Sequence, residues 1–319
     1  MGAISRQTIV MVAATTAIIA GFSIWWFRRK AKKIPVTRVE KIFIYPVKSL
    51  RGIDVPYVNC VSEGPRFEDL RDRTMMIVEN DFFVSQREEP SLARVQLSYR
   101  DGNIHIGAEG MPSINFPALD PDARKKERKS VRVRKNSYVA VDVSTEASAW
   151  FRRYLKKDNL HLVRILQEEC YRPTGSNNPI AFQDSASFHI VSETSLLDLK
   201  SRVSDKTISE RNFRPNFFIV GCDAYAEDTW SYVQLGEATL VYKERCPRCV
   251  LTTVNPDTGI KTGQEPLSTL RKYRTDRSEK GRAKYELHPL FGVRHFLFAK
   301  GTVRVGDQVC AVLSSKPLL

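Results

Sequence analysis

Residues 246–259 read CPRCVLTTVNPDTG and place two thiols, Cys246 and Cys249, three positions apart on a turn. Residues 238–242, just before the pair, are strand-like. Residues 250–254, just after it, are β-branched and apolar, which predicts a further strand. Thiolates in proteins serve either as redox partners or as ligands of soft metals. The role of this pair therefore decides how the rest of the chain is interpreted.

Local spacing leaves four interpretations of the pair open. Two of them are a pair of structural cysteines in a reduced protein, and a thioredoxin-type dithiol, which would need a helix after the second thiol. A structural zinc site would need a second pair of ligands. The other cysteines are scattered singly: Cys60, Cys170, Cys222 and Cys310. In the fourth interpretation Cys249 alone binds a redox metal, and Cys246 is only its neighbour.

The composition is that of a globular protein with a basic balance. Of the 319 residues, 42% are hydrophobic and 27% are charged, and the length allows two ordinary domains. The formal net charge is +14; residues 1–33 carry six basic and no acidic side chains, which leaves +8 for the remainder. This balance favours anionic partners such as phosphates, acidic proteins or membrane surfaces. Because no zinc-finger spacing or RNA-binding aromatic motif is present, we expect no nucleic-acid binding.

Residues 8–27 form a segment of twenty residues without a charge. As a helix rising about 1.5 Å per residue, it would just cross a hydrocarbon core of about 30 Å. The basic residues lie behind the segment, at 28–33, whereas a cleaved signal peptide carries them in front. We therefore expect residues 1–33 to be a single-pass transmembrane anchor in the lipid bilayer, with the C-terminal domain facing the cytosol. The mitochondrial outer membrane is the expected membrane, with the endoplasmic reticulum as the alternative.

Beyond the anchor the chain is rich in short strands. The sequence predicts strands over residues 41–45, 74–78, 82–85, 95–99, 103–106, 131–134, 138–141, 216–220, 238–242, 250–254, 295–299 and 303–309. Asp101-Gly102 is the strongest hairpin signal. Apolar periodicity over 147–155 predicts a helix, and Ser192 caps another that runs to about Val203. The pattern favours an α+β fold with barrel-like packing, divided at a turn-rich linker into domains of residues 34–169 and 170–319.

Three further clusters place cations at predicted strand edges. They are YPVKS at 45–49, LRDR at 70–73 and FRPN at 213–216. Lysine and arginine beside a proline-fixed turn suit phosphate groups and planar polar heterocycles. Taken singly, each cluster is more simply explained by surface ion pairing. The chain contains neither the glycine-rich P-loop nor the dinucleotide-binding fingerprint.

Four motifs in sequence order make the chain resemble the MOSC family. They are YPVKS at 45–49, NFRPN at 212–216, CPRC followed by LTTVNPDTG at 246–259, and VGD at 305–307. The resemblance extends over about residues 38–313. Within the family, the chain most resembles the membrane-anchored members that reduce amidoximes. It implies a β-rich MOSC-N domain packed on a β-barrel-like MOSC domain. It also implies a molybdenum–molybdopterin cofactor (Mo-MPT) whose metal takes one protein thiolate.

The resemblance implies which residues would hold this cofactor. Cys249 would be the metal ligand and the catalytic thiolate. The other cofactor-binding residues would be Lys48, Ser49, Arg73, Asp184, Ser185, Arg214, Asn216 and Arg248. Sulfur ligands suit a redox-active molybdenum, and a dianionic phosphate would explain converging cations. The chain departs from the family at Arg294, where an aromatic hydroxyl is common.

The implied function is that of an oxidoreductase, which reduces small N-hydroxylated compounds such as amidoximes to their N–H forms. The chain has no iron–sulfur, haem or flavin motif, so its electrons must come from outside. The resemblance implies cytochrome b5 and NADH-cytochrome b5 reductase as the donors. The alternative is a MOSC-type sulfur or molybdenum-cofactor carrier that holds a persulfide on Cys249. His295 and Asp184 are candidate proton donors for the reduction.

Overall fold

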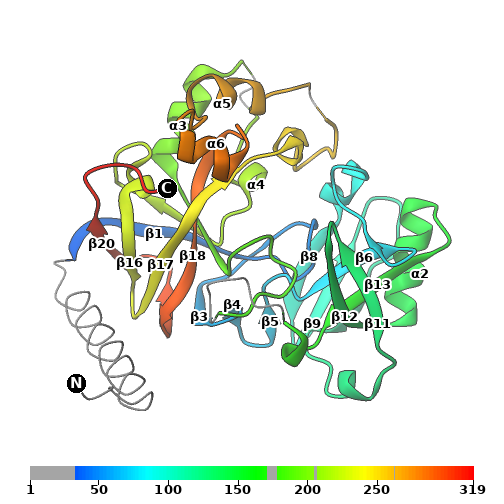
Figure 1. The fold of residues 1–319 in the computed structure, drawn as a ribbon. Coiled ribbons are helices and arrows are strands. Elements are labelled where there is room, and N and C mark those ends of the chain that lie inside the picture. The colour runs from blue at the N-terminus through cyan, green and yellow to red at the C-terminus, as the bar shows by residue number, and fades with distance from the viewer. Residues whose placement is uncertain (1–32, 171–177, 205–206, 262) are drawn as a thin grey trace, which may run out of the picture. The chain divides into compact units, whose positions relative to one another are not determined.

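The computed structural model describes residues 33–170, 178–204, 207–261 and 263–319 (Figure 1). The expected anchor, residues 8–27, lies outside these ranges. Within them, no helix is both long and apolar enough to cross a membrane.

The largest sheet has eight strands in the order β15-β14-β18-β17-β16-β20-β1-β2. Their bounds are β1 (Ile34–Ile44), β2 (Ile53–Asp54), β14 (Phe188–Ser192), β15 (Phe217–Val220), β16 (Trp230–Leu235), β17 (Ala238–Pro247), β18 (Leu290–Ala299) and β20 (Gln308–Leu313). Because β1 also pairs with β15, the sheet returns on itself, with Val39 opposite Ile219. The prediction of barrel-like packing is confirmed.

A second, smaller barrel closes from strands of the first half of the chain. It consists of β6 (Met75–Glu79), β7 (Phe82–Phe83), β11 (Lys129–Val133), β12 (Asn136–Asp142) and β13 (Leu160–Ile165). Helix α2 (Thr145–Leu155) lies against β13 at the outer side of this barrel (Figure 1). The Ser144 side chain caps α2 by accepting from the Ala147 amide, and Trp150 and Phe151 are buried on its inner face. The predicted helix is therefore confirmed.

Two short sheets complete the β structure. One contains β8 (Gln96–Arg100), β9 (Asn103–Gly107) and β10 (Ile114–Pro117), and the other contains β3 (Tyr57–Val61), β4 (Gly64–Phe67), β5 (Leu70–Arg71) and β19 (Gly301–Arg304). The β8–β9 turn has φ of 50° at Asp101 and 75° at Gly102, as a two-residue hairpin of right-handed twist requires, so the predicted hairpin is confirmed. Strand β19 joins the end of the chain to its first half, since Gly301 pairs with Cys60.

The remaining helices are short. They are α3 (Glu193–Arg202), α4 (Glu210–Phe213), α5 (Leu267–Tyr273) and α6 (Glu279–Tyr285), with 3-10 turns η1 (Pro90–Arg94), η2 (Ala123–Lys125), η3 (Gln167–Glu169), η4 (Ala226–Thr229) and η5 (Val250–Thr253). Helices α3, α5 and α6 gather at one end of the eight-stranded sheet (Figure 1). Ser192 caps α3 as predicted, by accepting from the Ser195 amide.

The predicted strand over residues 250–254 is wrong. Residues Val250–Thr253 form η5 instead. Two β-branched side chains close this turn, because the Thr252 hydroxyl donates to the Cys249 carbonyl at 3.0 Å and the Thr253 hydroxyl donates to the Val250 carbonyl at 2.8 Å. Local hydroxyl-to-backbone bonds of this kind compete with strand pairing and override the β propensity of the sequence.

Candidate functional site

Most of the predicted site residues line one small pocket, with a volume of about 120 Å³. We call it the thiol pocket. Its lining includes Lys48, Ser49, Arg73, Asp184, Arg214, Asn216, Arg248 and Cys249. Ser185 does not line it, but the Arg294 side chain, which does, donates to the Ser185 hydroxyl at 2.8 Å.

Cys249 lies two residues after the end of β17 and is the N-cap residue of η5. Its side chain is partly exposed, whereas Cys246 is buried. Both cysteines are free. The short 3-10 turn after Cys249 is not the helix of a βαβ unit, so it does not match the thioredoxin-type arrangement. Among the residues that the structure describes, no three His, Cys, Asp or Glu side chains gather as a metal-binding group, so the second ligand pair of a zinc site is not found there.

Arg248 holds the cysteine loop to the body of the domain. Its buried guanidinium donates to the Phe291 carbonyl at 2.6 and 2.8 Å and to the Phe213 carbonyl at 3.0 Å. It also donates to Nε2 of His189 at 2.7 Å. Because Nε2 accepts, the hydrogen of the ring lies on Nδ1, which donates to the Arg214 carbonyl at 3.2 Å. Because most of its N–H donors are used in these hydrogen bonds, Arg248 mainly fixes the position of the cysteine loop.

Arg73 and Arg214 lie over the ring of Tyr45, at 4.6 and 4.4 Å from its centroid. Both residues have positive φ, 52° and 57°, which turns the chain sharply at each position. Nη1 of Arg214 donates to the Leu50 carbonyl at 2.6 Å, while its Nη2 is buried without a hydrogen-bond partner among the described residues. Burial and the charge of Arg73 lower the pKa of Arg214 to about 10. The pair thus concentrates positive charge and leaves a donor unused.

Lys48 is a further cation in the lining of the thiol pocket. Its buried ammonium donates to the Phe182 carbonyl at 2.8 Å and to the Asp184 carboxylate at 2.7 Å. Burial lowers the pKa of Lys48, and the Lys48 charge holds the pKa of Asp184 well below its usual range. Arg294 also contacts Asp184, at 3.3 Å, and donates to Glu244 at 3.0 Å. Asp184 is therefore an ionised carboxylate that orients two cations.

Asn216, in the lining of the pocket, joins the eight-stranded sheet to the segment that follows β5. Its amide nitrogen donates to the Phe43 carbonyl at 3.2 Å and to Asp72 at 3.0 Å, and its oxygen accepts from the His189 amide at 3.1 Å. Asp72 in turn accepts from the Tyr45 amide at 3.0 Å and forms an ion pair with Arg73. As with Arg248, these bonds use the polar atoms of Asn216 for positioning.

The lining of the thiol pocket is strongly cationic. Among the residues that the structure describes, it contains seven lysine or arginine residues and a single carboxylate, that of Asp184. Sequence reasoning missed several lining residues: Phe83, Arg87, Arg134, His189, Asn212 and, as a site residue, Arg294. Arg134 lies in the β11–β12 turn and Arg87 follows β7, and only the closed small barrel brings these positions to the pocket. No local motif marks them. The excess of cations beside one accessible thiol suits an anionic ligand that also presents a soft metal.

Two family models match most of the chain. Residues 36–158 match the MOSC N-terminal beta barrel domain, and residues 177–310 match the MOSC domain. The chain is 36% identical over 312 residues to mitochondrial amidoxime reducing component 2 of Macaca fascicularis, which covers 94% of this chain and 92% of that protein. It is 34% identical over 311 residues to mitochondrial amidoxime-reducing component 1 of Homo sapiens, and this match covers 94% of this chain and 90% of that protein. The chain therefore belongs to the MOSC-domain family of the mitochondrial amidoxime reducing components.

Proposed function

We propose that this protein is a molybdenum-cofactor oxidoreductase that reduces N-hydroxylated compounds, such as amidoximes, to their N–H forms. The observation that carries the proposal is the thiol pocket, where one partly exposed cysteine faces a lining of seven cations and one carboxylate. Membership of a family whose relatives are named for amidoxime reduction supports the same reaction class.

The residues of the pocket fit a molybdopterin. The Cys249 thiolate would be the protein ligand of the metal, and Lys48, Arg73 and Arg214 would bind the pterin and its phosphate. The unpartnered Nη2 of Arg214 is a donor that an anionic ligand would use. Bound there, the molybdenum would supply the two-electron chemistry that cleaves an N–O bond. Arg248 and Asn216 would hold the binding groups in place through their bonds to backbone carbonyls.

Reduction of an amidoxime to an amidine consumes two electrons and two protons and releases water. Neither of the proton donors considered from the sequence suits this role. Asp184 is ionised because Lys48 lowers its pKa. His295 is fully buried, does not line the pocket, and has its pKa lowered to about 3 by burial. The fixed groups of the pocket therefore serve to bind charge, and protons would reach the substrate from solvent at the pocket mouth.

We also propose cytochrome b5 and NADH-cytochrome b5 reductase as the electron donors. A chain of net charge +14 would attract an acidic haem protein before contact. The reduction rate with that partner should then fall steeply as ionic strength rises. A rate that is flat with salt would contradict electrostatic docking.

Residues 8–27 are proposed to anchor the protein in the mitochondrial outer membrane, with the remainder in the cytosol. Their uncharged length and the basic residues behind them support this topology. Protease added to intact mitochondria should remove the domain from residue 34 onward. Protection of that domain would reverse the proposed orientation.

The decisive test is molybdenum content of the purified full-length chain, compared between wild type, Cys249→Ala and the matched variant Cys246→Ala. We expect near-stoichiometric molybdenum in wild type and Cys246→Ala, and a near-complete loss in Cys249→Ala. The rate of amidoxime reduction should be proportional to the molybdenum content of each variant. A chemical reductant supplies the electrons in this assay, so that the result does not depend on the donor proteins. A persulfide on Cys249 without metal would instead identify the sulfur or cofactor carrier. Equal loss in both variants would point to a dithiol.

A further inference from the structure

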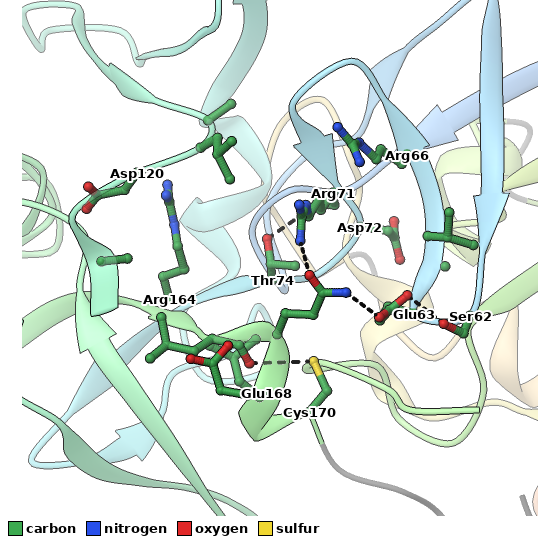
Figure 2. Close-up of a pocket in the computed structure, with 18 of the residues that line it drawn as sticks. Ser62, Glu63, Arg66, Arg71, Asp72, Thr74, Asp120, Arg164, Glu168 and Cys170 are labelled. Atoms are coloured by element: carbon green, nitrogen blue, oxygen red, sulfur yellow. Dashed lines mark hydrogen bonds between the residues drawn. The ribbon is translucent and has the colours of Figure 1, made fainter. Parts of the chain in front are cut away.

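A second cavity, with a volume of about 410 Å³, is lined mainly by residues between 61 and 170, with Lys300 from the C-terminal part of the chain (Figure 2). Its walls come from the β3–β4 and β4–β5 region, residues 118–124, and the segment from Arg164 to Cys170. We call it the arginine cavity. It shares no lining residue with the thiol pocket, so the proposed cofactor does not account for it. Its size is within the range of small-molecule sites.

Arg164 is the most unusual residue of this cavity. It lies on β13 and is only 7% exposed. Its Nη2 donates to the Pro117 carbonyl at 2.7 Å, but Nε and Nη1 are buried with no hydrogen-bond partner among the described residues. Burial lowers the pKa of Arg164 to about 10, so the group is still charged at neutral pH. A buried charged donor without a partner is costly, and it is usually retained where something binds to it.

Arg71 brings a second incomplete guanidinium to the same cavity. Its Nη1 donates to Gln167 at 3.2 Å, while its Nε is buried without a partner in the described part of the chain. The charge of Arg71 further lowers the pKa of Arg164, so the two cations are close enough to repel one another. In Figure 2, Arg164 lies beside Asp120 on one side and Arg71 lies beside Thr74 on the other.

The carboxylates of the wall already have donors elsewhere. These pairs are Glu63 with Ser62 and Gln167, Glu168 with Arg124, Asp120 with Lys126, and Asp72 with Arg73 and Asn216. Asp120 offsets part of the Arg164 charge, but its carboxylate bonds to Lys126 at 2.7 Å. The cavity wall therefore holds three unused cationic N–H positions and, among the described residues, no carboxylate that meets them.

We propose that the arginine cavity binds a small phosphorylated molecule, with the phosphate between Arg164 and Arg71. Arg164 on β13 and Arg71 on β5 bring three unused donors from two strands, and guanidinium groups bind phosphate oxygens through charge-assisted hydrogen bonds. Leu119, Ile165 and Leu166 also line the cavity and offer apolar surface to the organic part of such a ligand.

Binding of phenyl phosphate, measured by calorimetry on molybdenum-loaded full-length protein, tests this assignment. Arg164→Met and Arg71→Gln should each weaken binding by about tenfold or more, because each removes charge-assisted hydrogen bonds. Arg153→Gln, at an exposed arginine on α2, is the matched control and should bind like wild type. Amidoxime reduction should be unchanged in all three. If Arg164→Met does not fold, Arg71→Gln still decides the matter, because Arg71 is partly exposed and, within the described ranges, its side chain bonds only to Gln167.

The position of the anion is tested separately, with selenate as an anomalous scatterer in crystals of the loaded protein. We expect a peak between Arg164 and Arg71. Selenate found only in the thiol pocket, or phenyl phosphate affinities that are equal in wild type and both cavity variants, would overturn the proposal.

Discussion

Replacement of Glu227 by glutamine should change how the stability of the protein depends on pH. Glu227 is fully buried on η4, and its carboxylate accepts from the hydroxyls of Ser192 and Ser195 at 2.9–3.2 Å. Burial, and then the neighbouring charge of Asp228, raise the pKa of Glu227 from 4.5 to about 7. Arg274 opposes this shift only weakly, since it forms an ion pair with Asp228 at 2.6 Å.

The sign follows from which state binds the proton more tightly. Since the folded pKa exceeds the unfolded value, the folded state is favoured at low pH, and this stability is lost as pH rises from about 4.5 to about 7. The difference between the two values corresponds to about 3 kcal/mol at most. The side-chain amide introduced by Glu227→Gln would keep hydrogen bonds to both serines, because an amide donates and accepts and a hydroxyl can do either. The free energy of unfolding of the variant should therefore stay constant over the pH range in which that of wild type falls.

Thermal unfolding near pH 5 and near pH 8 measures the effect. For a chain of 319 residues, 1 kcal/mol moves the Tm by roughly 1.5 °C, so Glu227→Gln should gain roughly 4 °C relative to wild type between the two conditions. Glu127→Gln, at an exposed glutamate, is the matched control and should follow wild type. Parallel pH profiles for wild type and Glu227→Gln would refute the reasoning. A uniform loss at both pH values would mean that the carboxylate is simply structural.

Three other changes have defined outcomes. Lys48→Met removes the cation that neutralises Asp184, and we expect purified protein to retain less pterin, measured by fluorescence of the oxidised cofactor. In Gly292→Ala, a Cβ would lie 2.7 Å from Nε2 of His189 at a φ of 72°, so both the Tm and the molybdenum content should fall. Intact metal loading in that variant would contradict the role of the His189–Arg248 bond. Trp150→Ala leaves a cavity between α2 and the core and should lower the free energy of unfolding by about 3–5 kcal/mol, measured by chemical denaturation. The affinity of the thiol pocket for molybdenum should not change.

Locally encoded features could be predicted from the sequence. The Asp101-Gly102 hairpin, helix α2 and the Ser192 cap depend on residues within one turn of each other, and each is confirmed. The prediction of a strand over residues 250–254 was wrong because it rested on the β-branched, apolar pattern alone. That pattern does not show that the hydroxyls of Thr252 and Thr253 bond to nearby backbone carbonyls. The pairing of β1 with β15 joins residues far apart in sequence and carries no local signal.

The sequence predicted part of the lining of the thiol pocket and none of its geometry. The motifs identified residues that the fold brings to one pocket, including Lys48, Arg214 and Cys249. They could not indicate that Arg248 and Asn216 use their polar atoms on backbone groups, since side-chain direction depends on the packed structure. Their assignment to the cofactor stays a prediction that the metal and pterin measurements will test.

The register of β1 also has a consequence for synthesis on the ribosome. Arg38 pairs with Val220, so the N-terminal part of β1 finds its partner in β15 only after some 180 further residues have been translated. Until then, β1 can pair only with the two-residue β2, opposite Phe43 and Ile44, so Ile42, which is buried in the finished protein, lies on a strand that is unpaired over most of its length. Chains whose synthesis stops before β15 would therefore expose an unpaired apolar strand, so we expect them to aggregate or to bind chaperones.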